Sequence, residues 1–168
     1  MIYILGSVHA TKQYLWDNIY YKGDILETLK KIFRDVIDSA LSGLFDCIAH
    51  LDYIKYHIPY KYWRPELLEK EIEELLDAIQ SEGICMEVNT AGLLFTPPSL
   101  YPDDFIIKMA YERGIPVVVS SDAHSPDRVG AGFKEAYEKL LSIGYEEVNY
   151  FSKRKRHSYK IKDALKFL

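Results

Sequence analysis

The sequence predicts an α/β protein built around a parallel sheet, either open or closed into a barrel. Helical patterns alternate with short apolar runs that have the length of strands, and four of the helical patterns end in a glycine directly before the next run. This alternation is typical of βαβ units. The runs are also almost continuously apolar, as expected for parallel strands that are covered on both faces.

The first repeated unit follows an apolar run at residues 4–9. Apolar residues spaced at the period of a helix fill residues 25–37. Asp24 and Glu27 fit a capping box at the start of this helix, and Gly43 marks its end. The next strand is predicted at residues 44–49, and it leads directly into His50.

Three further units repeat the pattern. The second helix opens at Pro65, a favoured first helical position, and ends at Gly83 before a strand at residues 84–89. The third runs from about residue 102 to Gly114 and precedes a strand at residues 117–119. The fourth spans residues 133–144 and precedes a strand at residues 147–151, and a closing helix is predicted at residues 160–168. The basic run at residues 153–157 is expected on the solvated surface.

Length and composition fit a single domain spanning residues 1–168. The chain has 168 residues, of which 48% are hydrophobic, and this is enough to bury a sizeable core. A net charge of −4 gives no electrostatic reason to expect nucleic acid as a partner. The short apolar run after Met1 is too short for us to expect a signal peptide or a membrane span there. Cys47 and Cys85 lie in apolar runs without CxxC spacing, which predicts buried free thiols and a cytoplasmic protein.

Candidate metal ligands follow three of the predicted strands. Asp122 and His124 come directly after the apolar run at residues 116–120, while His50 and His9 close two other runs. A buried carboxylate or imidazole there is costly unless a metal, a partner or a substrate compensates it. The carboxyl ends of parallel strands meet at one edge of the sheet, which predicts a shared site. Imidazole and carboxylate suit zinc, iron or manganese. We expect Asp122 and His124 on one face of the strand, because strand side chains alternate.

Three polar residues are predicted to support these ligands. Glu87 could bind a metal, orient a ligand by a hydrogen bond, or pair with a cation, and we favour the orienting role. Asn89 shares a strand face with Glu87, and Asp52 follows His50 by two residues, so both are assigned similar parts. His57 and His157 lie in polar, aromatic or basic stretches and are expected at the surface.

Positive charge for a substrate could come from Lys55, Arg64 or Arg154. The first two lie in a loop after His50 that is rich in aromatic residues, namely Tyr53, Tyr56, Tyr60, Tyr62 and Trp63. Such a loop suits either a substrate lid over the site or packing against the helices. The sequence contains no glycine-rich phosphate loop, GxSxG elbow or Cys/His nucleophile pair.

Together these segments resemble the PHP (polymerase and histidinol phosphatase) family, specifically its histidinol-phosphatase branch. The order and spacing of the motifs carry the resemblance, which extends over nearly the whole chain. The matching segments are residues 6–9, 43–52, 87–90, 121–126 and 129–133.

The resemblance implies a distorted, TIM-like (β/α)7 barrel with two or three divalent metal ions at its carboxyl-terminal mouth. By this likeness, His9 and His50 share one metal and Asp122 and His124 reach the others. Asp122 or His124 would also help transfer a proton, as catalytic residues. The implied reaction is hydrolysis of L-histidinol phosphate, a small phosphorylated substrate, to L-histidinol and phosphate in histidine biosynthesis.

The sequence also departs from the family pattern. The family begins with a strand carrying His-x-His, and no His-x-His occurs here. The chain therefore resembles the carboxyl-terminal two-thirds of the barrel, with the N-terminal strands absent. An exposed barrel edge would favour self-association or a complementing N-terminal chain. A catalytically inactive metal-binding or interaction module, and a PHP phosphoesterase acting on another substrate, are the alternative functions.

Overall fold

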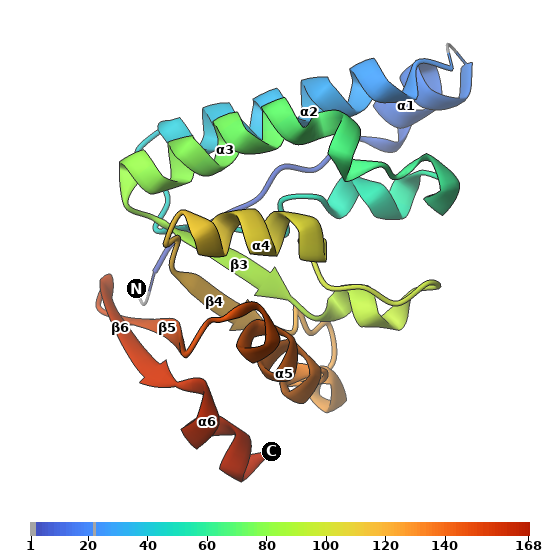
Figure 1. Cartoon of the computed structure of the whole chain (residues 1–168). Helices are drawn as coiled ribbons and strands as arrows, with labels where there is room; N and C mark the ends of the chain where they lie inside the picture. The colour runs from blue at the N-terminus through green and yellow to red at the C-terminus, as the bar shows by residue number, and fades with distance from the viewer. Residues whose placement is uncertain (1–2, 22) are drawn as a thin grey trace.

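Four parallel strands form the main sheet of the protein (Figure 1). The computed structural model describes residues 3–21 and 23–168, so the predicted features at Met1 lie outside the described residues. Neighbouring strands pair in chain order, which confirms the predicted α/β fold with a parallel sheet. The strands are β1 (Leu5–Gly6), β2 (Cys47–Ile48), β3 (Cys85–Asn89) and β4 (Val117–Ser120).

The helices pack against one another and against the sheet in chain order, with α2 beside α3, α3 beside α4, and α4 beside α5 (Figure 1). Fully buried residues from α2, α3, β3 and α4 meet in the core between them, including Phe33, Leu75, Met86 and Ile106. The helices are α1 (Lys12–Leu15), α2 (Ile25–Leu41), α3 (Glu69–Glu82), α4 (Asp104–Glu112), α5 (Phe133–Ile143) and α6 (Ile161–Ala164), and a π-helical turn, η1 (Trp16–Tyr21), follows α1.

The predicted helix boundaries are set by local capping. The Asp24 carboxylate accepts a hydrogen bond from the backbone N–H of Glu27 at 3.2 Å, as expected for the start of α2. Pro65 begins a 3₁₀ turn, η4 (Pro65–Leu68), so α3 starts one turn later than predicted. Gly83 ends α3 in the left-handed conformation, with φ of 64°. α1 and η1 were not predicted.

The last strands depart from the predicted parallel arrangement. β5 (Glu147–Ser152) pairs antiparallel with β6 (Lys155–Lys160) in a separate two-stranded sheet. Lys153 and Arg154 form the two-residue connection with positive φ angles of 51° and 62°, a turn whose twist matches an antiparallel hairpin. The basic run therefore forms the turn and much of β6, and its side chains are exposed as predicted.

The two cysteines lie next to one another on β2 and β3. Cys47 and Cys85 are register partners, and both are buried free thiols, as predicted. They form a small apolar cluster with Val118, against which Tyr3 and Phe151 pack. Burial raises the pKa of each thiol above its ordinary value, so both stay protonated near neutral pH. None of the helices in the described part of the chain is long and apolar enough to cross a membrane.

Asp46 joins three distant segments at the amino ends of the strands. Its carboxylate accepts hydrogen bonds from the backbone N–H of Ile4 at 2.7 Å and from Arg154 Nη2 at 2.9 Å and Nε at 3.1 Å. The Arg154 side chain, supported by the Ile4 N–H, holds the pKa of Asp46 below its ordinary value. Asp46 thereby connects the segment before β1, the start of β2 and the β5–β6 turn.

We expect Asp46→Asn to lower the free energy of unfolding by about 1–2 kcal/mol at neutral pH, because solvent partly screens the half-exposed Arg154. Since the folded-state pKa of Asp46 is depressed, this contribution is complete at neutral pH and is lost as the pH falls through that pKa. Urea unfolding at neutral and acidic pH measures both effects. Asp163→Asn, which removes an exposed pair with Lys166, is the control with little expected change. An equal destabilisation by Asp46→Asn at both pH values would contradict the assignment.

Candidate active site

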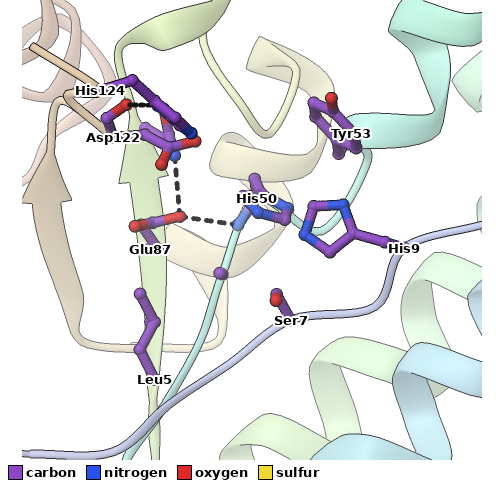
Figure 2. A pocket seen from close by; sticks show the side chains of 10 residues that line it. Leu5, Ser7, His9, His50, Tyr53, Glu87, Asp122 and His124 are labelled. Carbon is purple, nitrogen blue, oxygen red and sulfur yellow. Dashed lines mark hydrogen bonds between the residues drawn. The ribbon is translucent and has the colours of Figure 1, made fainter.

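A cavity of about 260 Å³ lies at the carboxyl ends of the parallel strands. It brings together the four residues predicted as metal ligands, with His9 after β1, His50 after β2, and Asp122 and His124 after β4 (Figure 2). The complete lining is Leu5, Ser7, His9, Ala49, His50, Tyr53, Glu87, Asn89, Asp122 and His124.

His9 and His50 form one side of the pocket. Their ring centroids are 4.9 Å apart at an interplanar angle of 71°. His50 is 7% exposed, and its Nδ1 is buried without a hydrogen-bond partner in the described residues. Partial burial, and then the neighbouring His50, lower the pKa of His9. A lowered pKa favours the neutral imidazole that metal ions bind, and the orphaned His50 Nδ1 is an atom that a metal or ligand would satisfy.

Asp122 and His124 lie together on the other side of the pocket (Figure 2). β4 ends at Ser120, and Asp122 adopts a φ of 48°, so the chain has left the extended conformation. The prediction that strand alternation puts both side chains on one face is therefore wrong in its reason. A turn brings them together instead, with His124 Nδ1 2.8 Å from the Asp122 carbonyl oxygen. If Nδ1 donates this hydrogen bond, Nε2 is left with the lone pair that binds metals.

The expected burial of Asp122 and His124 is also not observed. Both side chains are exposed, whereas the strand that precedes them begins with fully buried Val117. The turn after Ser120 carries them out of the sheet and over the mouth of the pocket. Both side chains are accessible to solvent, so the desolvation cost inferred from the sequence applies to the buried His50 instead.

Glu87 lies beneath the predicted ligands and binds three neighbouring groups. Its Oε2 accepts hydrogen bonds from the His50 N–H at 2.9 Å and from Asn89 Nδ2 at 3.2 Å. Its Oε1 accepts one from the Ser120 hydroxyl at 2.6 Å. Both carboxylate oxygens are thus engaged, an arrangement that suits the predicted orienting role of Glu87 better than direct metal binding. Asn89 in turn accepts the Ala91 N–H through Oδ1 at 2.9 Å.

Asp52 and Lys55 form a buried ion pair beside the pocket. Lys55 Nζ is 2.9 Å from Asp52 Oδ2 and donates a further hydrogen bond to the Leu100 carbonyl oxygen at 2.6 Å. Asp52 Oδ2 also accepts the Asp103 N–H at 2.8 Å. Burial raises the pKa of Asp52 although Lys55 opposes the rise. The Lys55 ammonium is thus buried against Asp52 and Leu100, and Lys55 is not part of the pocket lining.

The two predicted arginines lie elsewhere. Arg64 forms an exposed ion pair with Glu66, and Arg154 binds Asp46 at the opposite ends of the strands. Neither lines the pocket, so the sequence-based placement of these cations beside the substrate is not supported by the geometry. Among the described residues, the pocket lining contains no lysine or arginine. Proximity in sequence to the His50 strand, or to the last motif, does not fix where a long side chain points, so a substrate contact by these arginines stays a prediction.

Tyr53 and Ser7 line the pocket but were not predicted as site residues. Tyr53 lies three residues after His50 at the start of a 3₁₀ turn, η2 (Tyr53–His57). Ser7 precedes His9 by two residues. The spacing of each from a predicted ligand was the signal available in the sequence.

The aromatic loop is partly packed and partly exposed. Ile54, Ile58 and Trp63 are buried in the core, and Trp63 Nε1 donates to Asp103 Oδ2 at 3.2 Å. Tyr56, Tyr60 and Tyr62 are exposed on the surface. The packing interpretation therefore holds for the buried side chains, while the lid remains a prediction for the exposed ones. His57, expected at the surface, is half-buried, with its ring 5.2 Å from that of Tyr53.

The predicted ligands form two pairs rather than one closed metal site. In the part of the chain that the structure describes, no three histidine, cysteine, aspartate or glutamate side chains are arranged to hold one metal ion. Each pair supplies part of a donor set made of imidazole nitrogen and carboxylate oxygen, which suits zinc, iron or manganese.

Comparison with known families identifies the class of protein. A model of the PHP domain matches residues 1–91, and a model described as PHP-associated matches residues 104–139. The first match covers more than half of the chain. The chain therefore belongs to the PHP domain family.

Its relatives belong to the histidinol-phosphatase branch. A protein named probable histidinol-phosphatase from Deinococcus radiodurans is 33% identical over 153 residues, covering 88% of this chain and 57% of the relative. One of the same name from Thermotoga maritima is 33% identical over 123 residues, covering 69% and 50%. The chain thus spans between half and three-fifths of the length of these relatives.

A solved structure has the same fold. The crystal structure of histidinol phosphate phosphatase from Lactococcus lactis, complexed with zinc, L-histidinol and phosphate, superposes with a TM-score of 0.77. The match covers 93% of this chain and 62% of that protein, at 18% sequence identity. At this identity the likeness establishes the α/β fold.

We expect Glu87→Ala to lower the free energy of unfolding by about 3 kcal/mol, because the buried His50 N–H and Asn89 amide and the half-buried Ser120 hydroxyl would lose their acceptor. Glu87→Gln keeps one acceptor oxygen and should cost about 1 kcal/mol. Denaturant unfolding of the two variants measures the difference. Equal stability of both variants and the unmodified protein would show that the carboxylate does not hold these strand ends together.

Replacing Lys55 tests whether it is structural. Lys55→Met leaves Asp52 buried without its partner and should cost about 3–5 kcal/mol. Arg64→Ala removes only an exposed pair and should change stability by less than about 0.5 kcal/mol. Thermal and denaturant unfolding compare the two variants. A small cost for Lys55→Met would instead point to a lysine that is free to face a substrate.

Proposed function

We propose that this chain forms part of a metal-dependent phosphomonoester hydrolase of the histidinol-phosphatase type, which converts L-histidinol phosphate to L-histidinol and phosphate. The observation that carries the proposal is the convergence of His9, His50, Asp122 and His124 on one pocket. The names of the relatives, and the zinc, L-histidinol and phosphate bound by the Lactococcus lactis protein, supply the reaction and the substrate class.

The donor atoms of the pocket suit divalent metal ions. We assign His9 and His50 to one ion and Asp122 and His124 to the others, with two or three ions of zinc, iron or manganese in the complete site. The buried Nδ1 of His50, which has no hydrogen-bond partner in residues 3–21 and 23–168, supports this assignment. A bound metal lowers the pKa of a coordinated water and neutralises phosphoryl oxygens.

The remaining side chains of the pocket would prepare and complete the reaction. Glu87 fixes the backbone of His50 through its N–H, and so holds that imidazole at the pocket wall. Asp122 or His124, exposed at the mouth, would hand a proton to the departing alcohol. Because no lysine or arginine among the described residues lines the pocket, the phosphoryl charge would be met by metal ions or by groups outside this lining.

A complete site would need further ligands. We propose that the four-stranded sheet is part of a distorted (β/α)7 barrel in which additional strands contribute those ligands. β1 pairs with β2 and with no other strand among the described residues, so its second edge is available for pairing. A complementing N-terminal segment or self-association would cover that edge. The two free thiols suit a reducing compartment, and we place the protein in the cytoplasm.

One observation favours a second function. The described residues hold no group of three ligands around one metal position. A catalytically inactive module that binds metal weakly, or that serves an interaction, would need no more than the two pairs present.

Metal content and turnover distinguish these functions. Metal bound per chain is measured by mass spectrometry, and phosphate release from L-histidinol phosphate is measured with and without added manganese, iron or zinc. Phosphate release that depends on the added metal would establish the hydrolase. Bound metal without any turnover would show that this chain alone is not the hydrolase, and would favour the inactive module.

We expect Asp122→Ala and His124→Ala each to weaken metal binding by at least about tenfold, because each removes one donor from a pair. Metal affinity is measured by competition with a chelator. His157→Ala is the control, because this exposed histidine stacks on Tyr150 in the hairpin and does not line the pocket. Unchanged metal affinity in both pocket variants would refute the assignment of the site.

A further inference from the structure

We propose that Tyr53 is a positioning residue, which holds the His9 and His50 imidazoles in place, and that the buried Asp52–Lys55 ion pair fixes the turn that carries Tyr53. This inference rests on the proposed function, because it concerns the geometry of the same candidate ligands. It gives a role to three residues that the proposed reaction does not use directly.

The Tyr53 ring contacts both histidine rings. Its centroid is 5.1 Å from that of His9 and 5.0 Å from that of His50, and it also lies 5.2 Å from the His57 ring and 5.7 Å from the Tyr101 ring. Figure 2 shows Tyr53 beside His9 and His50 on the same side of the pocket, opposite Asp122 and His124. Aromatic contacts at these distances favour particular ring orientations.

Ring contacts matter for His50 because, within the described part of the chain, one of its ring nitrogens lacks a hydrogen bond that would orient the imidazole. Its Nδ1 has no hydrogen-bond partner among the described residues, so no hydrogen bond at that atom fixes the imidazole. The backbone of His50 has a φ of 21°, a strained value for a residue with a side chain. Two hydrogen bonds hold it there, from the His50 N–H to Glu87 and from the Tyr53 N–H to the His50 carbonyl oxygen at 2.9 Å.

The Asp52–Lys55 pair anchors the turn that presents Tyr53. The Lys55 N–H donates to the Asp52 carbonyl oxygen at 2.9 Å, and Lys55 Nζ binds the Asp52 carboxylate at the same distance. Through Leu100 and Asp103, the pair is also tied to the chain between β3 and α4. Asp52 is fully buried and Lys55 is 7% exposed, so water does not screen this link. Tyr53 lies between the two partners in sequence, so the pair restrains the backbone that carries its ring.

The test compares Tyr53→Leu with Tyr53→Phe. NMR of the histidine imidazoles in metal-free protein reports ring order without any metal, and chelator competition reports zinc affinity. Tyr53→Leu should broaden and shift the His9 and His50 signals, leave His157 unchanged, and weaken zinc binding by about tenfold. Tyr53→Phe keeps the ring and should restore both readouts.

Tyr56→Leu is the matched control. Tyr56 lies in the same turn and contacts Tyr53, His57 and Phe95, but among the described residues it has no ring contact with His9 or His50. The double variant Asp52→Asn with Lys55→Met removes both charges together, which avoids a lone buried charge. It should broaden the His50 signal as Tyr53→Leu does.

The results separate the inference from the proposed function. Unchanged His9 and His50 signals in Tyr53→Leu would overturn the positioning role, as would an equal effect of Tyr56→Leu. If the unmodified protein binds none of zinc, iron or manganese, the proposed function fails, and the metal-free NMR comparison still decides whether Tyr53 orders the two rings. Loss of the His50 signal in Tyr53→Leu but not in the double variant would overturn the part assigned to the ion pair.

Discussion

The arrangement of the pocket depends on one buried carboxylate, that of Glu87. The strands β1 and β2 are only two residues long, so backbone pairing alone gives the ends of the sheet little rigidity. Glu87 supplies it from β3, since one oxygen binds the backbone after β2 and the other binds the last residue of β4. The chain segments that carry candidate ligands on the two sides of the pocket are thus hydrogen-bonded to the same carboxylate. A carboxylate that is 2% exposed can do this because three donors compensate its burial.

Opposite ends of the same sheet are held by the same chemistry. At the amino ends, Asp46 accepts from the start of the chain's described part and from the hairpin turn. At the carboxyl ends, Glu87 accepts from His50 and Ser120. Helices that pack on a sheet hold its strands in one layer, but they do not position the chain segments beyond the strand ends. A sheet with short strands therefore needs such crosslinks.

Much of this was predictable from periodicity and capping. Apolar spacing and terminal glycines predict helices α2 to α5. The parallel topology predicts that the residues after the strands lie at one edge of the sheet, as observed for His9, His50, Asp122 and His124. The hairpin was not predicted, because a two-residue turn of Lys153 and Arg154 carries none of the usual glycine or asparagine signals. The directions of Lys55, Arg64 and Arg154 were not predictable either, since long side chains choose partners that only the assembled fold brings near. Tyr53 was not predicted to line the pocket, because the sequence does not distinguish an aromatic residue that contacts metal ligands from one that packs in the core.

The two sides of the pocket differ in their contact with solvent, and this has a kinetic consequence. His50 is buried, and hydrogen bonds at its N–H and its carbonyl oxygen hold its backbone, whereas the side chains of Asp122 and His124 are exposed to solvent. A hydrated ion sheds its water stepwise, and exposed donors meet it first. If the proposed metal ions bind in this pocket, Asp122 and His124 would capture and release an ion, while the buried His50 imidazole would govern how long the ion stays. The rate at which metal ions enter the pocket and the time for which they stay bound would then be set by residues on opposite sides of it.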